Sequence, residues 1–179
     1  FMGEIVDDKT AFTVGSPVSY HSSDPAQDLY IDSFLKYNNM AALDSDTMTM
    51  ATAVAVAYRY YWMEDDKLKA TLLPSWDVIY LDYEPELITI ILSMKNGKKY
   101  ADVFKGSVFI RLALVDGGDF TIKYNLLGQP VVAYPNNPLW ASDVYKVVEM
   151  LDAYDLTLAD CINETAQLRT AYLNIQGGL

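Results

Sequence analysis

The chain has 179 residues, 51% of them apolar, and a formal net charge of −11 at pH 7; this predicts a folded domain, with or without a protruding arm, and excludes a disordered chain. Only 13 Lys and Arg stand among 24 Asp and Glu, which excludes the basic surface that grips nucleic-acid phosphates. There is no apolar run of about 18 residues and no secretory signal, so we expect a soluble, cytosolic protein without membrane contact.

The first part of the chain predicts an extended segment and then a helix. Residues 5–20 are expected to be extended, because Gly15 and Pro17 interrupt any regular helix. A helix then starts at Asp24 and Pro25, as the N-cap and the first helical residue. Its buried face is expected to hold four apolar residues, namely Leu29, Ile31, Phe34 and Leu35.

A second helix is predicted over residues 44–57, which are rich in Ala and Met. Met50, Val54 and Ala57 share one side of this helix and are expected to be well buried. Both helices would pack against the strands that follow.

Six or seven strands are predicted next, as an antiparallel meander over residues 58–63, 68–73, 78–83, 87–94, 98–104, 108–115 and 120–124. Turn residues separate them, and Asn96-Gly97 is the strongest short-range hairpin signal. Residues 64–67 and 116–119 mark further turns. The predicted fold class is α+β, an antiparallel β meander packed on two short helices and followed by one long C-terminal α-helix.

The last stretch joins a short apolar strand and an Asn-Pro turn to that long helix. The helix begins near Ser142, a suitable N-cap, with Asp143 in the first turn, where a negative charge suits the exposed N–H groups. It runs without Pro or Gly until Gly177, and about 35 residues at 1.5 Å each make a rod on the order of 50 Å long. Apolar residues recur along it in heptad-like steps, at Val144, Val147, Leu151, Tyr154, Leu158, Cys161, Leu168, Tyr172 and Ile175.

Two interpretations of this rod are open: a core or dimer helix, or an arm that leaves the body. We divide the chain into an α+β body, residues 1–137, and the long helix, residues 138–179. Cys161 is the only cysteine, which excludes an intrachain disulfide, and its place on the apolar stripe predicts a buried thiol.

No pattern predicts catalysis. His21 is the only histidine, and its neighbours Ser22 and Asp24 are too near in sequence to converge with it as a triad. The acidic pairs Asp44 with Asp46 and Asp116 with Asp119 fit turns and caps, because no twelve-residue calcium loop is present. We therefore predict no catalytic, cofactor-binding or metal-binding residues. A metal-dependent hydrolase would require carboxylates that converge only in the folded chain.

Basic residues cluster in one place. Lys95, Lys98 and Lys99 flank the Asn96-Gly97 turn, and we interpret them as a solvated hairpin tip.

Short segments that stand in order along the chain carry a further signal. Residues 14–20 read VGSPVSY, residues 31–38 read IDSFLKYN, and residues 53–58 read AVAVAY. Residues 128–137 read GQPVVAYPNN, followed by Ser142-Asp143 and by LDAYD at 151–155. In this order the segments resemble the portal (head-to-tail connector) protein of tailed bacteriophages. The family writes G-x-P-V-V-x-[FY]-x-N-N for the fourth segment and a Gly where Ala55 stands here.

The resemblance implies a non-enzymatic structural subunit without cofactors. Such subunits assemble into a ring, commonly dodecameric, at one capsid vertex of the virion, after assembly in the host cytoplasm. The ring passes DNA during packaging and ejection without sequence-specific binding, and it docks the terminase large subunit, head-completion and tail connector proteins, and scaffold proteins. The resemblance covers the outward wing and the start of the stem, so the clip, second stem helix, tunnel loop and crown would lie beyond Leu179.

On this interpretation one side of the long helix is a subunit interface, formed by Val144, Val147, Leu151, Tyr154 and Leu158. Three carboxylates are expected to face a neighbour or the channel, namely Asp152, Asp155 and Asp160. The alternative is an α+β module that binds a ligand or peptide and dimerises through the long helix.

Overall fold

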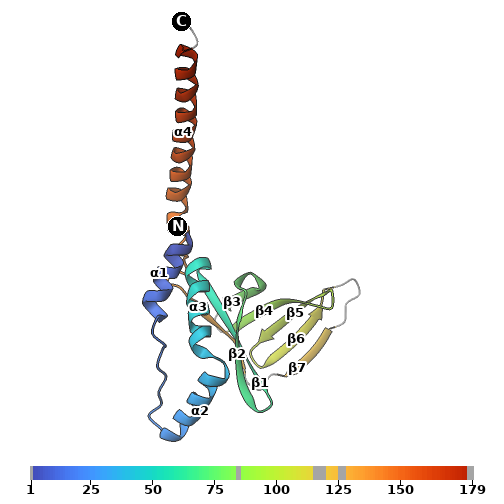
Figure 1. Cartoon of the computed structure of the whole chain (residues 1–179). Helices are drawn as coiled ribbons and strands as arrows, with labels where there is room; N and C mark the ends of the chain where they lie inside the picture. Colours follow the sequence, from blue (N-terminus) through green and yellow to red (C-terminus); the bar gives the residue numbers. More distant parts are fainter. Residues whose placement is uncertain (1, 84–85, 115–119, 125–127, 177–179) are drawn as a thin grey trace.

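The computed structural model describes residues 2–83, 86–114, 120–124 and 128–176, and the fold is α+β, as predicted. Three helices come first: α1 (Met2–Val14), α2 (Pro25–Tyr37) and α3 (Met40–Val54). Antiparallel strands in two sheets follow, and then one long helix, α4 (Tyr145–Gln176). Figure 1 shows α4 rising away from a body that the other elements form.

Helix α1 shows that the expectation of an extended segment over residues 5–20 is wrong for its first part. Residues 2–14 are helical, and α1 packs on α3 with Val6 buried. Gly15 ends the helix and does not prevent it: its N–H donates to the carbonyl of Ala11 at 3.0 Å. A β-carbon at Gly15 would lie 2.2 Å from that carbonyl oxygen, so the position requires glycine.

Helix α2 begins as predicted. The carboxylate of Asp24 accepts the N–H of Ala26 at 2.9 Å, and Pro25 is the first helical residue. The predicted buried face is wrong at Leu29, which is 71% exposed, whereas Ile31, Phe34 and Leu35 are half-buried.

Helix α3 starts and ends earlier than predicted. Its buried residues are Met40, Leu43, Asp44, Thr47, Ala51 and Thr52. The expected stripe is wrong: Met50 is half-buried, Val54 is 41% exposed, and Ala57 is buried but belongs to a strand. The helix ends because Ala55 takes a positive φ of 82° and turns the chain into that strand.

One sheet has three strands in the order β2-β1-β8, from β1 (Val56–Glu64), β2 (Lys67–Leu73) and β8 (Val131–Pro135). The first two strands form the predicted hairpin. Strand β8 returns from far along the chain to pair with β1, with Val56 opposite Pro135. Helices α2 and α3 pack on this sheet.

The second sheet has five strands in sequence order, β3 (Val78–Tyr83), β4 (Glu86–Lys95), β5 (Lys98–Lys105), β6 (Val108–Ala113) and β7 (Phe120–Tyr124). The predicted strands are therefore confirmed, but they are divided between two sheets. The division follows Pro74 and a short 3₁₀ turn, η1 (Ser75–Asp77), which redirect the chain. Asn96 and Gly97 have φ values of 53° and 73°, as a tight hairpin turn requires. The predicted turn at residues 116–119 lies outside the described residues.

The core lies between the two sheets. Its buried members are Tyr58, Val78, Ile91, Phe104 and Val131. Aromatic rings from both sheets meet there. The ring centroids of Tyr58 and Tyr80 are 5.6 Å apart, and those of Tyr60 and Phe104 are 6.0 Å apart. None of the described helices is both long and apolar enough to cross a membrane.

Candidate assembly interface

The long helix α4 leaves most of its side chains in solvent. From Asp152 to Leu168 every residue is exposed, and the apolar ones include Tyr154 at 54% and Leu158 at 48%. Cys161 is exposed as well, so the prediction of a buried thiol is wrong. It was based on a stripe whose outer residues, Leu158 and Leu168 among them, are exposed. An apolar stripe of this length, left uncovered, is a surface for association.

The start of α4 up to Leu151, here called its root, is more buried than residues 152–168. Val144, Val147 and Leu151 are half-buried. Beside them an apolar groove of about 510 Å³ separates α4 from α1, lined by Glu4, Ile5, Asp8, Val147, Met150, Leu151 and Tyr154. Of the five predicted seam residues, three are half-buried at the root, Tyr154 is exposed at the edge of the groove, and Leu158 is exposed beyond it.

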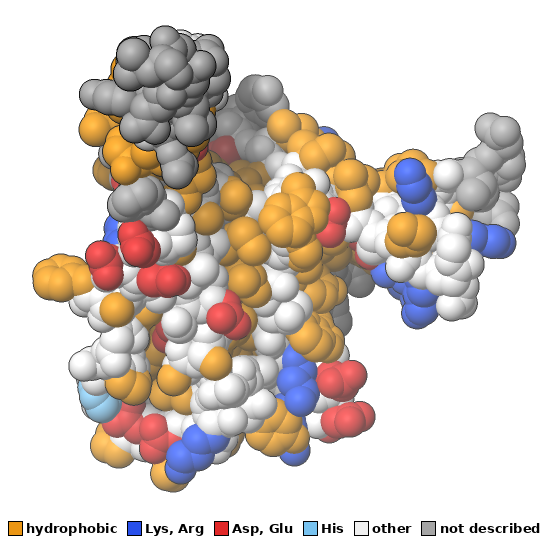
Figure 2. Space-filling model, turned by 45° about the horizontal axis from the view of Figure 1, so that its top comes forward, with side chains coloured by type: hydrophobic (Ala, Val, Ile, Leu, Met, Phe, Trp, Pro, Cys, Tyr) orange, Lys and Arg blue, Asp and Glu red, His pale blue; other side chains and the backbone are white. Residues whose placement is uncertain are grey.

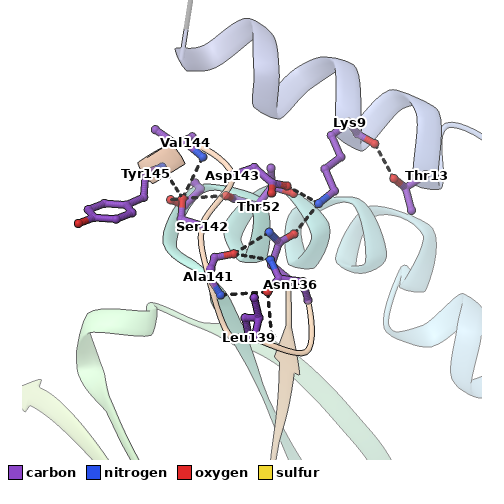
Figure 3. A network of polar contacts seen from close by, with 12 residues as sticks. Lys9, Thr13, Thr52, Asn136, Leu139, Ala141, Ser142, Asp143, Val144 and Tyr145 are labelled. Carbon is purple, nitrogen blue, oxygen red and sulfur yellow. Dashed lines mark hydrogen bonds and ion pairs between the residues drawn. The ribbon is translucent and has the colours of Figure 1, made fainter. Parts of the chain in front are cut away.

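Ser142 joins the end of α3 to the start of α4 (Figure 3). Its hydroxyl donates to the carbonyl of Ala53 at 2.6 Å, with the carbonyl of Thr52 at 3.1 Å. The same oxygen accepts the N–H groups of Val144 and Tyr145 at 3.1 and 3.3 Å. This is the predicted N-cap, with the helix assigned three residues later, and the one hydroxyl satisfies backbone groups of two helices.

Lys9 of α1 holds the same joint from the other side. Its ammonium donates to Oδ1 of Asn136 at 2.7 Å and pairs with the carboxylate of Asp143. The N–H of Asp143 in turn donates to the carbonyl of Thr52 at 3.2 Å. Both side chains of the pair are partly screened from solvent, with 33% and 22% exposed for Lys9 and Asp143. The joint therefore ties α1, α3 and α4 together.

Two asparagines brace the loop before α4. Asn136 and Asn137 each donate a side-chain N–H to the carbonyl of Ala141, at 2.9 and 2.7 Å. Oδ1 of Asn137 also accepts the N–H groups of Leu139 and Ala141. The loop is thus closed by its own side chains, which fixes the direction in which α4 leaves the body.

Backbone strain is concentrated at the two ends of this joint. Ala55 has φ 82° and ψ −30°, and Trp140 has φ 51°, a region that non-glycine residues avoid. The carbonyl of Ala55 accepts the N–H of Asn136 at 2.9 Å, and the Trp140 ring lies 6.0 Å from Tyr80 of the second sheet. Contacts with both sheets hold these two residues in their unusual conformations.

The three carboxylates singled out on α4 are exposed. At about 100° per residue around a helix, Asp152 and Asp160 lie on the side opposite the apolar stripe. Asp155 lies about 40° from Leu151 and so borders the stripe. The three therefore do not form one patch, because Asp155 alone is next to the apolar residues.

A buried ion pair fixes α3 on the sheet below it. Arg59 of β1 is 4% exposed and donates to Oδ1 of Asp44 at 2.6 Å and to Oγ1 of Thr47 at 2.7 Å. Burial lowers the pKa of Arg59, but the hydrogen bonds with Asp44 and Tyr61 outweigh it and leave the pKa raised. Tyr20, in the linker before α2, donates its hydroxyl to the other oxygen of Asp44 at 2.9 Å. Asp44 thus has a structural role. It is a member of the pair Asp44 and Asp46, one of the two acidic pairs considered in the sequence analysis.

The second layer of this network consists of tyrosines. The hydroxyls of Tyr61 and Tyr134 lie 2.9 Å apart, and the Arg59 guanidinium lies 4.6 Å from the centre of the Tyr134 ring. Burial, and then the hydrogen bond to Tyr61, raise the pKa of Tyr134 to about 12. The neutral phenol is therefore the form that this packing favours.

The other candidate sites do not assemble. His21 is exposed, and Ser22 beside it binds Gln27 and Asp28 to close the start of α2. Within the described residues no three His, Cys, Asp or Glu side chains lie together as a metal site would need. The pair Asp116 and Asp119 lies outside those residues. What the sequence analysis missed is the joint itself, although its Asn, Ser and Asp residues lie in the segments quoted there.

The joint and the exposed helix belong to one continuous family match. A family model described as phage portal protein, SPP1 Gp6-like, matches residues 1–178. No curated protein matches the chain.

Proposed function

This chain belongs to the phage portal protein family, and we propose that it is one subunit of a portal ring at a capsid vertex. The family is structural and non-enzymatic. In the proposed ring, DNA passes through the central channel during packaging and ejection. The terminase large subunit, scaffold, and head-completion and tail connector proteins would dock on the ring at successive stages.

The observation that carries the proposal is the apolar stripe of α4, exposed on its outer part, above a hydrogen-bonded joint. An uncovered stripe in water favours association, and the bracing by Lys9, Asn136 and Ser142 would give every subunit the same helix direction. Identical heterologous contacts, repeated at one angle, close into a ring when the rotation between neighbours divides a full turn evenly. We propose Val144, Val147, Leu151, Tyr154 and Leu158 as the seam against a neighbouring subunit.

The carboxylates have separate roles on this model. Asp152 and Asp160, on the side away from the seam, would face the channel, where negative charge removes the attraction of DNA phosphates for the wall. Asp155, at the border of the seam, would face a neighbouring subunit. The division of the chain into a body, residues 1–137, and a stem helix within residues 138–179 is part of the same proposal.

The test is ring assembly by variants of the seam, scored by negative-stain electron microscopy of the full-length gene product. Leu158→Asp should abolish rings, because a carboxylate would be buried without a partner. Leu151→Asp should do the same, but Leu151 also packs beside α1, so Leu158, which is 48% exposed, is the cleaner probe. Asn163→Asp, on the far side of the helix, adds the same charge and should assemble normally.

Two outcomes would contradict the proposal. Dimers at every concentration of the wild-type chain would favour the dimerising module in its place. Normal rings from Leu158→Asp would show that the stripe is not the seam.

A further inference from the structure

The five-stranded sheet has one face that is apolar across its whole width. Strand register places Ile79, Ile90, Val103, Ile110 and Ile122 in one row, one residue from each strand. Residues two positions away continue the same face, with Leu81 opposite Ile88 on one side and Leu92, Ala101 and Leu112 in line on the other. We call this surface the outer sheet face.

The opposite face of the sheet is the one that packs on the body. Val78, Ile91 and Phe104 enter the core between the sheets. Farther out this face becomes polar, because Asp102 and Arg111 pair side by side with two contacts of 2.6 Å. A sheet with one face on the core normally turns polar residues outward. This sheet has apolar residues on the face that is turned away from the core.

The outer sheet face is exposed at its edges and its tip, whereas Ile90, Val103 and Ile110 in its middle are half-buried and Ala101 is buried. Ile79 is 44% exposed, Ile122 is 55% exposed and Met94 is 71% exposed. The helices pack on the three-stranded sheet, and Figure 1 shows the five-stranded sheet projecting away from them. Apolar rows left in solvent in this way mark an interaction surface.

Charge is distributed unevenly between this sheet and the rest of the chain. Residues 86–124 contain six Lys and Arg and four Asp and Glu, a net charge of +2, whereas the total of −11 leaves −13 for the remainder. Lys99 and Lys105 lie on the outer sheet face, and Lys95 and Lys98 are at its tip. In Figure 2 the charged side chains on the outer part of the right-hand lobe are blue, whereas both red and blue ones lie over the rest of the molecule. An acidic surface with apolar residues at its centre would complement this face.

Helix α1 carries an exposed apolar residue with a carboxylate beside it. Phe12 is 95% exposed, and Asp8, one turn earlier, is exposed about 40° from it around the helix, whereas Asp7 lies on another side. Figure 1 places α1 and the five-stranded sheet on opposite sides of the body, so one chain cannot bring them together. Two different patches on opposite sides are what a head-to-tail contact between copies requires.

The size of the outer sheet face indicates how it is used. Five strands about 4.8 Å apart and six residues along a strand give a patch of roughly 20 by 20 Å, about half of what one partner contributes to a standard interface. The face is too small to hold a dimer by itself. It suits a second contact between two copies that another surface already holds together, because the first contact raises the effective concentration for the second.

We propose that the outer sheet face of one subunit binds α1 of the next copy of this chain, with Phe12 on the apolar rows and the Asp8 carboxylate near the lysines. The inference rests on the proposed ring and names a second contact within it. The contact would link neighbouring bodies, whereas α4 links neighbouring helices.

Site-specific cross-linking in the ring tests this contact. In a Cys161→Ser background, the double variant Phe12→Cys and Ile122→Cys is treated with a short bis-maleimide, and the products are separated on a denaturing gel. A ladder that extends to multiples of the chain is expected. The matched control places the second cysteine at Thr121, the adjacent exposed residue of β7 on the opposite face, and should give no ladder.

Assembly measurements give a second readout. Ile122→Asp should raise the concentration needed for ring formation at least about tenfold, because it places an unpaired charge in the contact, while Thr121→Asp should leave it unchanged. Rings without a ladder, or Ile122→Asp rings at wild-type concentration, would overturn this inference and leave the proposed function standing. An absence of wild-type rings would overturn both. Cross-links from Ile122 only to a different protein would also overturn it.

Discussion

Ala55 is an alanine in a backbone conformation that favours glycine. The family pattern that residues 53–58 resemble has glycine at this position, and the structure gives a reason for it: φ is 82°, where a β-carbon costs roughly 1–2 kcal/mol. Alanine persists because the carbonyl of Ala55 and the adjoining carbonyls of α3 anchor the loop before α4. Alanine in place of glycine at this position thus lowers the stability of the fold and leaves the path of the chain unchanged.

Replacing Ala55 by glycine should therefore stabilise the protein. We expect Ala55→Gly to raise the free energy of unfolding by about 1 kcal/mol, measured by urea denaturation of the purified chain. Ala53→Gly, two residues earlier and inside α3, should lower it by about the same amount, since glycine is unfavourable within a helix. Loss of stability in both variants would show that the strain at Ala55 is absent.

Tyr134 predicts a dependence of stability on alkaline pH. Burial raises its pKa to about 12 from an ordinary value of 10.0. The folded state thus favours the protonated phenol. The resulting stability is complete below pH 10 and is lost as pH rises toward 12.

Titration of phenolate absorbance and urea denaturation between pH 9 and about 12 would measure this loss. Tyr134→Phe should weaken the fall in stability over that range, because the titrating group is gone. Tyr145→Phe, on the exposed first turn of α4, should leave it unchanged. A wild-type chain whose stability stays level across this window would contradict the assignment.

Among the elements, α4 depends on its joint with α3. Ser142→Ala removes the acceptor for the first N–H groups of α4 and the donor to the end of α3. We expect a loss of about 1–2 kcal/mol in unfolding free energy, and fraying of the first turn of α4 in circular dichroism. Thr165→Ala, whose hydroxyl bonds only within α4 to the carbonyl of Cys161, serves as the control. If Ser142→Ala and Thr165→Ala lowered the free energy of unfolding equally, Ser142 would have no special role in joining α3 to α4.

The elements also show how far sequence patterns reach. Local signals predicted the Asp24 cap, the Asn96-Gly97 hairpin and the Ser142 cap, because each depends on neighbours within a few residues. Helix α1 was not predicted because Gly15 and Pro17 were expected to prevent a helix in the residues that precede them, whereas Gly15 only ends it. The pairing of β8 with β1 joins positions such as Val56 and Pro135, and no local pattern specifies a partner so far along the chain.

The same limit applies to the candidate interface. Periodicity identified the apolar stripe of α4 but could not tell that its outer part is exposed, so Cys161 was expected to be buried. The buried pair of Asp44 and Arg59 was not predicted, since nothing in the sequence links the two residues. Asn136, Asn137 and Ser142 lie in segments that resemble the family's, and only the structure shows that they act together as one joint.

At the scale of the whole molecule, the described chain is a body that supports itself and a helix that does not. The body has a core between two sheets, with Tyr58, Phe104 and Val131 buried. From Asp152 to Leu168 the side chains of α4 are exposed. A helix of that length without tertiary support is marginal in water. Its order in solution should therefore depend on assembly.

Hydrogen exchange of the single subunit and of the ring can measure this dependence. In the subunit, the amides of residues 152–168 should exchange fast, close to the rate of an unprotected chain, because local opening there breaks no packing. In the ring the same amides should be protected at least about tenfold, since each opening must first break the seam. Strands β1 and β4 serve as internal controls and should exchange equally slowly in both states. If residues 152–168 were already as protected in the subunit as α3 is, the helix would be stable alone, and assembly would be needed for the ring's contacts but not for the order of α4.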